Sequence, residues 1–140
     1  MCFNKKLSIL VFSVLTLPLS FAANQVVHYQ PEVVNLTGVV EIQTFPGRPN
    51  YQSIKNGDEI EKGAYLRLKQ SIDVLVMPND NVNEIEKNVK VIQIADDDIA
   101  DWQELKKGGY FRIKGVLFHR ITGHHHSRVL IDVKQIERMK

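Results

Sequence analysis

Residues 33–45 read VVNLTGVVEIQTF and alternate between apolar and polar side chains. The apolar positions are Val34, Leu36, Val40 and Ile42. A period of two residues predicts a β-strand with one buried face. Gly38 interrupts the alternation, and a glycine inside a strand typically marks a bulge or a sharp coil.

Four further segments have the character of strands: residues 65–77, 89–94, 110–119 and 128–136. Gly115 lies inside the fourth strand, as Gly38 lies inside the first. Residues 46–63 lack any periodicity and are rich in proline, glycine and asparagine. Such long loops are uncommon in small domains and are often functional or disordered, and the aromatic and proline residues here favour an ordered loop.

One helix is expected over residues 96–107. Asp96, Asp97 and Asp98 suit the positive end of the helix dipole, Lys106 and Lys107 suit the negative end, and Gly108 can end the helix. Five strands with a helix between strands three and four are the layout of an OB-fold, so we predict an all-β protein with one helix and an OB-fold-like barrel. An open antiparallel sheet packed on one helix is the alternative.

Residues 1–22 are predicted to be a cleavable signal peptide. Lys5 and Lys6 precede an apolar run over residues 7–19, and Ser20-Phe21-Ala22 places small residues where a signal peptidase reads them. Residues 23–32 are expected to be a polar lead-in, and residues 33–140 one domain. The protein is therefore expected in the periplasm or outside the cell, without a membrane anchor after cleavage.

The charge of the chain changes when the signal peptide is removed. The full sequence has 18 Lys and Arg against 16 Asp and Glu, and two of the lysines lie in the signal peptide. The remaining charges balance, which argues against nucleic acid as a partner because that binding needs clustered cations. Cys2 is the single cysteine and leaves with the signal peptide, so neither a disulfide nor a thiol nucleophile is expected.

The loops that join strands one and two and strands four and five flank the binding face of an OB-fold. They correspond here to residues 45–63 and 119–127. Aromatic faces and polar groups on these loops suit a sugar, a peptide or another protein. The predicted ligand-binding residues are Phe45, Arg48, Tyr51, Asp58, His119 and His125.

A metal site is a second interpretation of the histidines. The four candidates are His119, His124, His125 and His126, and imidazole is a common ligand of Zn²⁺ and Cu²⁺. A two-residue turn at Thr122-Gly123 would place three of these imidazoles on one face. A three-residue loop that pairs Leu117 with Val129 keeps the apolar face continuous and is preferred, although it leaves only two ligands together. We therefore expect no cofactor, with Zn²⁺ or Cu²⁺ as the alternative.

The sequence also resembles an uncharacterised family of small exported bacterial proteins, known as domain of unknown function 4431. The resemblance rests on residues 34–38 (VNLTG), 45–51 (FPGRPNY), 57–59 (GDE), 115–119 (GVLFH) and 122–126 (TGHHH). It implies a bacterial source and export but no activity. The pattern of this family often has a cysteine where this chain has Ile72-Asp73-Val74.

No catalytic constellation is visible in the sequence, because Ser53, Ser71 and Ser127 lack a serine-hydrolase context. We therefore expect an exported binding or inhibitory module, not an enzyme, whose partner is a protein or an envelope glycan. The alternatives are a metal-binding protein that uses the histidine loop and an immunity protein that neutralises a toxin.

Overall fold

The alternating segment over residues 33–45 forms a long strand, as predicted. β2 (Val33–Pro46) buries Val34, Leu36 and Val40, each of which is at most 4% exposed. The computed structural model describes residues 22–95 and 103–140, so the expected signal peptide lies outside the described residues except for Ala22. No helix within the described residues is long and apolar enough to cross a membrane.

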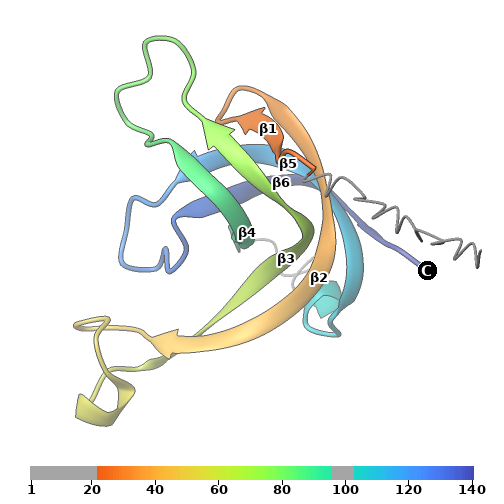
Figure 1. The fold of residues 1–140 in the computed structure, drawn as a ribbon. Helices are drawn as coiled ribbons and strands as arrows, with labels where there is room; N and C mark the ends of the chain where they lie inside the picture. Colours follow the sequence, from red (N-terminus) through yellow and green to blue (C-terminus); the bar gives the residue numbers. More distant parts are fainter. Residues whose placement is uncertain (1–21, 96–102) are drawn as a thin grey trace, which may run out of the picture.

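The protein is mostly β and has one six-stranded sheet (Figure 1). The strands besides β2 are β1 (Gln25–His28), β3 (Ile60–Leu75), β4 (Glu86–Ala95), β5 (Gly109–His119) and β6 (Val129–Arg138). Their order in the sheet is β1-β3-β2-β5-β6-β4.

The sheet also closes on itself, because β4 pairs with β3 as well as with β6. The pairings β3–β2, β2–β5, β5–β6, β6–β4 and β4–β3 form a ring, and β1 joins β3 outside it. The apolar faces of these strands turn inward and form one core around the fully buried side chains of Leu66, Ile92, Phe111, Ile113 and Ile131.

Gly38 and Gly115, the two glycines that the sequence placed inside strands, lie against the backbone of a neighbouring strand. A Cβ atom on Gly38 would lie 2.1 Å from the carbonyl oxygen of Arg67, and one on Gly115 would lie 2.2 Å from that of Asp132. The β5–β6 register also shifts between Lys114 and Gly115, which is the bulge that the sequence suggested. Both glycines therefore allow the tight curvature that closure of a small sheet requires.

The sheet has six strands where the sequence predicted five. The additional strand, β1, lies in the predicted lead-in and pairs in parallel with residues 72–75 of β3. Val27 and Tyr29 are buried in the core, at 3% and 0% exposure. A segment of four residues with one buried valine carries too little periodicity to be recognised as a strand.

The structure also has a helix at a position that the sequence did not predict. The helix whose bounds are described is a 3-10 turn, η1 (Ile54–Asn56), in the loop between β2 and β3, and not between the predicted third and fourth strands. The segment expected to be helical, residues 96–107, falls largely on residues 96–102, which are outside the described residues. Residues 103–105 are described and helical, and Leu105 is fully buried.

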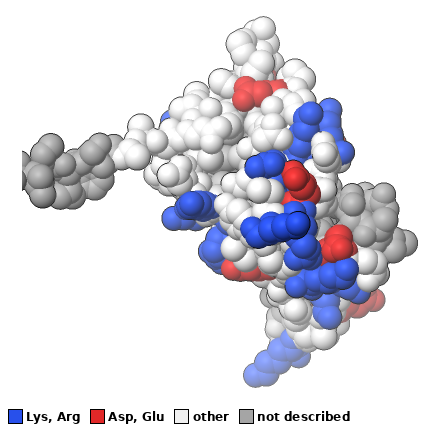
Figure 2. All heavy atoms as spheres, turned by 90° about the vertical axis from the view of Figure 1, so that its right-hand side faces the viewer, with Lys and Arg blue, Asp and Glu red and all other residues white. Residues whose placement is uncertain are grey.

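One outer face of the sheet carries charged side chains of both signs (Figure 2). Arg67 on β3 pairs with Glu41 on β2 at 2.8 Å, and Arg112 on β5 pairs with Glu137 on β6 at 3.1 Å. Lys and Arg form a band here with acidic residues among them. This face is polar and exposed, whereas the opposite face of the same strands forms the core.

Because the sheet is closed, adding a single methyl group at Gly38 is expected to reduce the stability of the protein strongly. We expect Gly38→Ala to lower the free energy of unfolding by about 3 kcal/mol, because the new Cβ meets backbone atoms that cannot move independently. Gly57→Ala is the control, since its Cβ meets no atom within 4 Å and only its φ of 105° is unfavourable, with a cost of about 1 kcal/mol. Urea denaturation measures both, and equal losses would contradict the assigned strand contact.

Candidate functional site

Two loops that are distant in the sequence meet at one end of the sheet. They are the β2–β3 loop, residues 47–59, and the β5–β6 loop, residues 120–128; together we call them the rim (Figure 1). The hydroxyl group of Tyr51 lies 3.0 Å from Nε2 of His124, and the two rings meet edge to face. A Cβ atom on Gly123 would lie 3.0 Å from the ring of Tyr51, so the loops are in direct contact.

Glu61, at the start of β3, joins the histidines to the sheet. Both of its carboxylate oxygens lie 2.9 Å from Nδ1 of His124, and one lies 3.7 Å from Nε2 of His126. The imidazole of His126 stacks on the ring of Phe45, with centroids 4.2 Å apart and planes 7° apart. Phe45 also contacts Tyr65 at 5.3 Å, and burial raises the pKa of the Tyr65 hydroxyl. Aromatic rings therefore lie beneath the rim, with the Glu61 carboxylate beside them.

Gln93 on β4 fixes the backbone of the β5–β6 loop. Its side-chain oxygen accepts hydrogen bonds from the backbone N–H groups of His126, at 2.6 Å, and Ser127, at 3.1 Å. Its side-chain nitrogen donates to the carbonyl oxygen of His124 at 2.8 Å. Gln93 is only 7% exposed, so a single buried amide supplies three bonds to this loop.

His125 is held as a neutral ring inside the loop. Its Nδ1 accepts hydrogen bonds from the backbone N–H groups of Ile121, at 2.9 Å, and Thr122, at 3.2 Å. Burial lowers its pKa, and the neighbouring His124 and His126 lower it further. Because Nδ1 accepts from two donors, the ring proton is assigned to Nε2.

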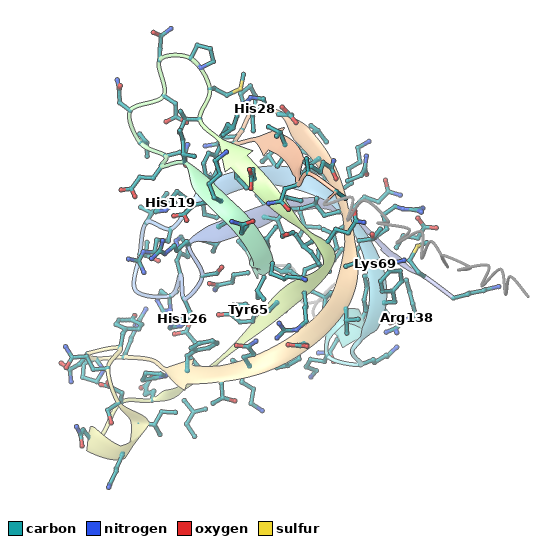
Figure 3. The ribbon with its side chains drawn as sticks, in the orientation of Figure 1. His28, Tyr65, Lys69, His119, His126 and Arg138 are labelled. Carbon is teal, nitrogen blue, oxygen red and sulfur yellow. The ribbon has the colours of Figure 1, made fainter. Side chains whose placement is uncertain are left out.

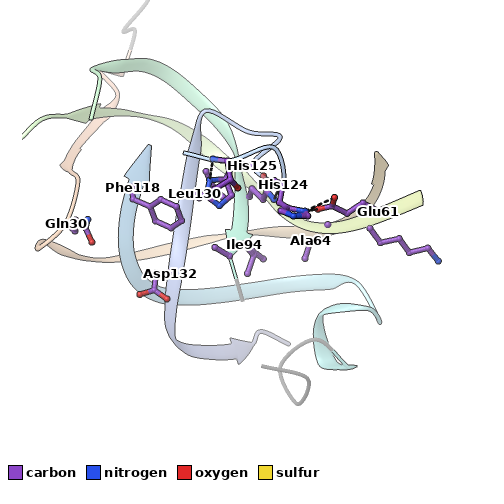
Figure 4. A pocket seen from close by; sticks show the side chains of 14 residues that line it. Gln30, Glu61, Ala64, Ile94, Phe118, His124, His125, Leu130 and Asp132 are labelled. Atoms are coloured by element: carbon purple, nitrogen blue, oxygen red, sulfur yellow. Dashed lines mark hydrogen bonds and ion pairs between the residues drawn. The ribbon is translucent and has the colours of Figure 1, made fainter. Parts of the chain in front are cut away.

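A pocket of about 770 Å³ lies beside these groups (Figure 4). His124 and His125 form part of its wall, Glu61 and Gln93 add polar groups, and Ile94, Phe118 and Leu130 add apolar surface. The rest of the lining is Gln30, Lys62, Gly63, Ala64, Ala95, Thr122 and Asp132. Its mixture of aromatic, apolar and hydrogen-bonding groups suits a polar organic ligand.

Three of the predicted binding residues lie in the rim or directly beneath it. Tyr51 and His125 lie in the two loops that meet, and Phe45 lies under His126. Arg48 is exposed and lines a smaller cavity of about 280 Å³ together with Glu59 and His124.

Asp58, in contrast, has a structural role in the β2–β3 loop. One carboxylate oxygen accepts from the backbone N–H groups of Gln52 and Ser53, and the other accepts from the backbone and the side chain of Asn50. The side chain is only 6% exposed, and these hydrogen bonds lower its pKa. Its acceptor positions are thus used to shape the loop, so the prediction that it contacts a ligand has no support from the geometry.

His119 lies apart from His126 (Figure 3), and the group of possible metal ligands found among the described residues includes neither His124, His125 nor His126. His119 ends β5 and pairs through Nε2 with Glu86 of β4 at 3.1 Å. Within the described residues, one group of at least three side chains could share a metal ion, and its only histidine is His119. The structure therefore does not bring His119, His124, His125 and His126 together as one site.

The register of the hairpin explains this separation. His119 pairs with Val129 and Leu117 pairs with Ile131, so the loop has nine residues where the prediction allowed three. The observed pairing of Leu117 differs from the predicted one by two residues. A shift of two residues leaves every side chain on its face of the sheet, so the apolar pattern could not distinguish the two registers.

Glu61, Gln93 and Phe118 were missed as site residues. The sequence does distinguish Gln93, because it is the one polar residue in the run Val91-Ile92-Gln93-Ile94. A polar side chain at such a position needs a buried partner. Glu61 and Phe118 carry no comparable signal, because only the pairing of distant strands brings them to the rim.

Residues 75–137 match the model of a domain of unknown function, DUF4431. Over this range, the match supports the resemblance to an uncharacterised family that the sequence motifs indicate. The motifs at residues 34–38, 45–51 and 57–59 lie outside the matched range. No match is found among curated proteins, and none among solved structures.

The three bonds of Gln93 predict that it controls the order of the β5–β6 loop. We expect Gln93→Leu to raise the amide exchange rates of His126 and Ser127 at least about ten-fold and to cost about 2 kcal/mol of stability, because the loop loses its buried partner. Hydrogen exchange by NMR measures the rates. Gln135→Leu, at an exposed position of β6, is the control. Unchanged exchange at both amides in Gln93→Leu would contradict this role.

Proposed function

We propose that the protein is an exported, non-enzymatic binding module of the OB-fold type, and that its rim binds another protein or a cell-envelope glycan. The order of strands around the ring is β2, β3, β4, β6, β5. When β2 is counted as the first strand, the rim consists of the loops between strands one and two and between strands four and five. These are the loops that flank the ligand face of an OB-fold barrel.

The observation that carries the proposal is the contact between the two loops beside a pocket. Tyr51 and His124 link them at 3.0 Å, and Glu61 holds the same imidazole from the other side. Loops that are fixed in this way pay little conformational entropy when a ligand binds. A preformed pocket of about 770 Å³ is within the usual size range of ligand sites.

The chemistry of the pocket favours a ligand with hydroxyl or amide groups. The ring of Phe118 offers an apolar surface, while Glu61 and Asp132 offer acceptors and the Nε2 of His125 offers a donor. Sugars and peptides both combine apolar patches with many hydrogen-bonding groups. An immunity protein that neutralises a toxin would use the same surface and differ only in its partner.

A reaction at this site has less support than binding. The hydroxyl group of Ser127 donates to the carbonyl oxygen of Val91 at 3.3 Å, and Nδ1 of His125 accepts from the backbone. Neither group is arranged as a nucleophile with its base. A Zn²⁺ or Cu²⁺ site in the histidine loop also lacks support, since the group of three possible ligands found among the described residues contains no side chain of residues 124–126.

The test uses two probes, purified peptidoglycan fragments for a glycan ligand and an envelope extract for a protein partner. We expect one of them to bind the protein, and Tyr51→Ala and His125→Asn each to weaken that binding at least about ten-fold. His125→Asn retains an acceptor for the backbone of the turn, so its melting temperature should change by less than about 5 °C.

Lys69→Ala is the matched control, because Lys69 is exposed and lies away from the rim (Figure 3). It should bind like the unchanged protein. Equal binding by all four proteins would place the ligand elsewhere. Loss of folding in both rim variants would make the rim purely structural.

A further inference from the structure

We propose that Glu84, Glu86 and His119 bind a divalent transition metal ion, with Zn²⁺ as the best fit, at a site separate from the pocket that Glu61 and His125 line. Nε2 of His119 lies 3.1 Å from a carboxylate oxygen of Glu86. One ligand atom from each of the three residues lies within 4.8 Å of the others. Two ligands of one tetrahedral Zn²⁺ are roughly 3.3 Å apart, so small side-chain movements bring all three into range.

The backbone around these ligands is already ordered. Asp80 accepts hydrogen bonds from the backbone N–H groups of Val82 and Asn83 and from the side chain of Asn83. The side-chain oxygen of Asn83 in turn accepts from the backbone N–H of His119 at 2.8 Å. The β3–β4 loop, which carries Glu84, is thereby fixed against the end of β5. A site of this kind needs little rearrangement to bind an ion.

Tyr29 is a second, independent observation that points to a ligand at this position. Its side chain is fully buried, and its hydroxyl group has no hydrogen-bond partner among the described residues. Its ring meets that of His119 edge to face at 6.4 Å. The buried tyrosine therefore lies against the imidazole that would hold the ion. Water on a bound metal ion would give the tyrosine hydroxyl a partner.

Two arginines are the main obstacle to a cation here. Arg128 contacts Glu86 at 3.4 Å, and Arg120 lines the same cavity of about 420 Å³. The side chain of Arg128 is 73% exposed, so it can leave at little cost. The competing interpretation is a plain ion-pair cluster of Glu86 with His119 and Arg128.

The donor set indicates the class of metal. One imidazole nitrogen and two carboxylate oxygens suit Zn²⁺ better than Ca²⁺ or Mg²⁺, which prefer oxygen ligands alone. Three protein ligands would leave at least one coordination position for water. We therefore expect an ion that remains accessible from the cavity.

The test is calorimetric titration of Zn²⁺ into the protein purified without a histidine tag. We expect one ion per chain with a Kd below about 10 µM. Glu84→Gln and His119→Gln should each weaken binding at least about ten-fold, and Tyr29→Phe by about ten-fold as a residue that positions the bound water. Glu84 is exposed, so its variant retains the fold.

Two further variants separate the proposal from its competitors. The double variant His124→Asn and His126→Asn should bind Zn²⁺ as the unchanged protein does, whereas Arg128→Gln should bind about three-fold more tightly because a competing cation is gone. A Kd weaker than about 0.1 mM, or binding lost in the double variant and kept in His119→Gln, would overturn the proposal. Both results are independent of ligand binding at the rim.

Discussion

The pairing of β4 with both β3 and β6 is the constraint on which the rest of the structure depends. It converts a row of strands into a ring, and a ring brings the β2–β3 and β5–β6 loops to one end. Without it, β3 and β4 would no longer meet. The β5–β6 loop could then no longer receive hydrogen bonds from Gln93 on β4 and, at the same time, contacts from Glu61 on β3. Closure in turn requires close backbone approach, which Gly38 and Gly115 permit.

The sequence predicts the long strands well, but it predicts the short strand and the register of the β5–β6 hairpin poorly. Alternation over residues 33–45 indicates β2 because one face of that strand is buried and the other is exposed. The close backbone approach at Gly38 and Gly115 was also recognisable in the sequence, since a side chain at either position would collide with a neighbouring strand. β1 escaped prediction because its four residues are held mainly by their pairing with β3, a contact distant in the sequence.

Contacts between residues distant in the sequence also limit how much of the candidate site the sequence predicts. The composition of the two loops draws attention to Tyr51 and His125, and both lie in the rim. It treats Asp58 in the same way, although this carboxylate bonds to the backbone at residues 50–53, since a loop aspartate has the same appearance in either role. It also groups His119 with the other histidines. The observed register instead places His119 beside Glu86, where a buried carboxylate and a buried tyrosine give it a different chemistry.

The most direct test of sheet closure is a proton NOE measurement between the aromatic rings of the two loops. Closure predicts strong cross-peaks between Phe45 and His126, whose ring centroids are 4.2 Å apart, and between Tyr51 and His124, at 5.0 Å. In an open sheet these rings would be too far apart for any NOE. Absence of both sets of cross-peaks in the folded protein would contradict the closed sheet, and with it the common rim.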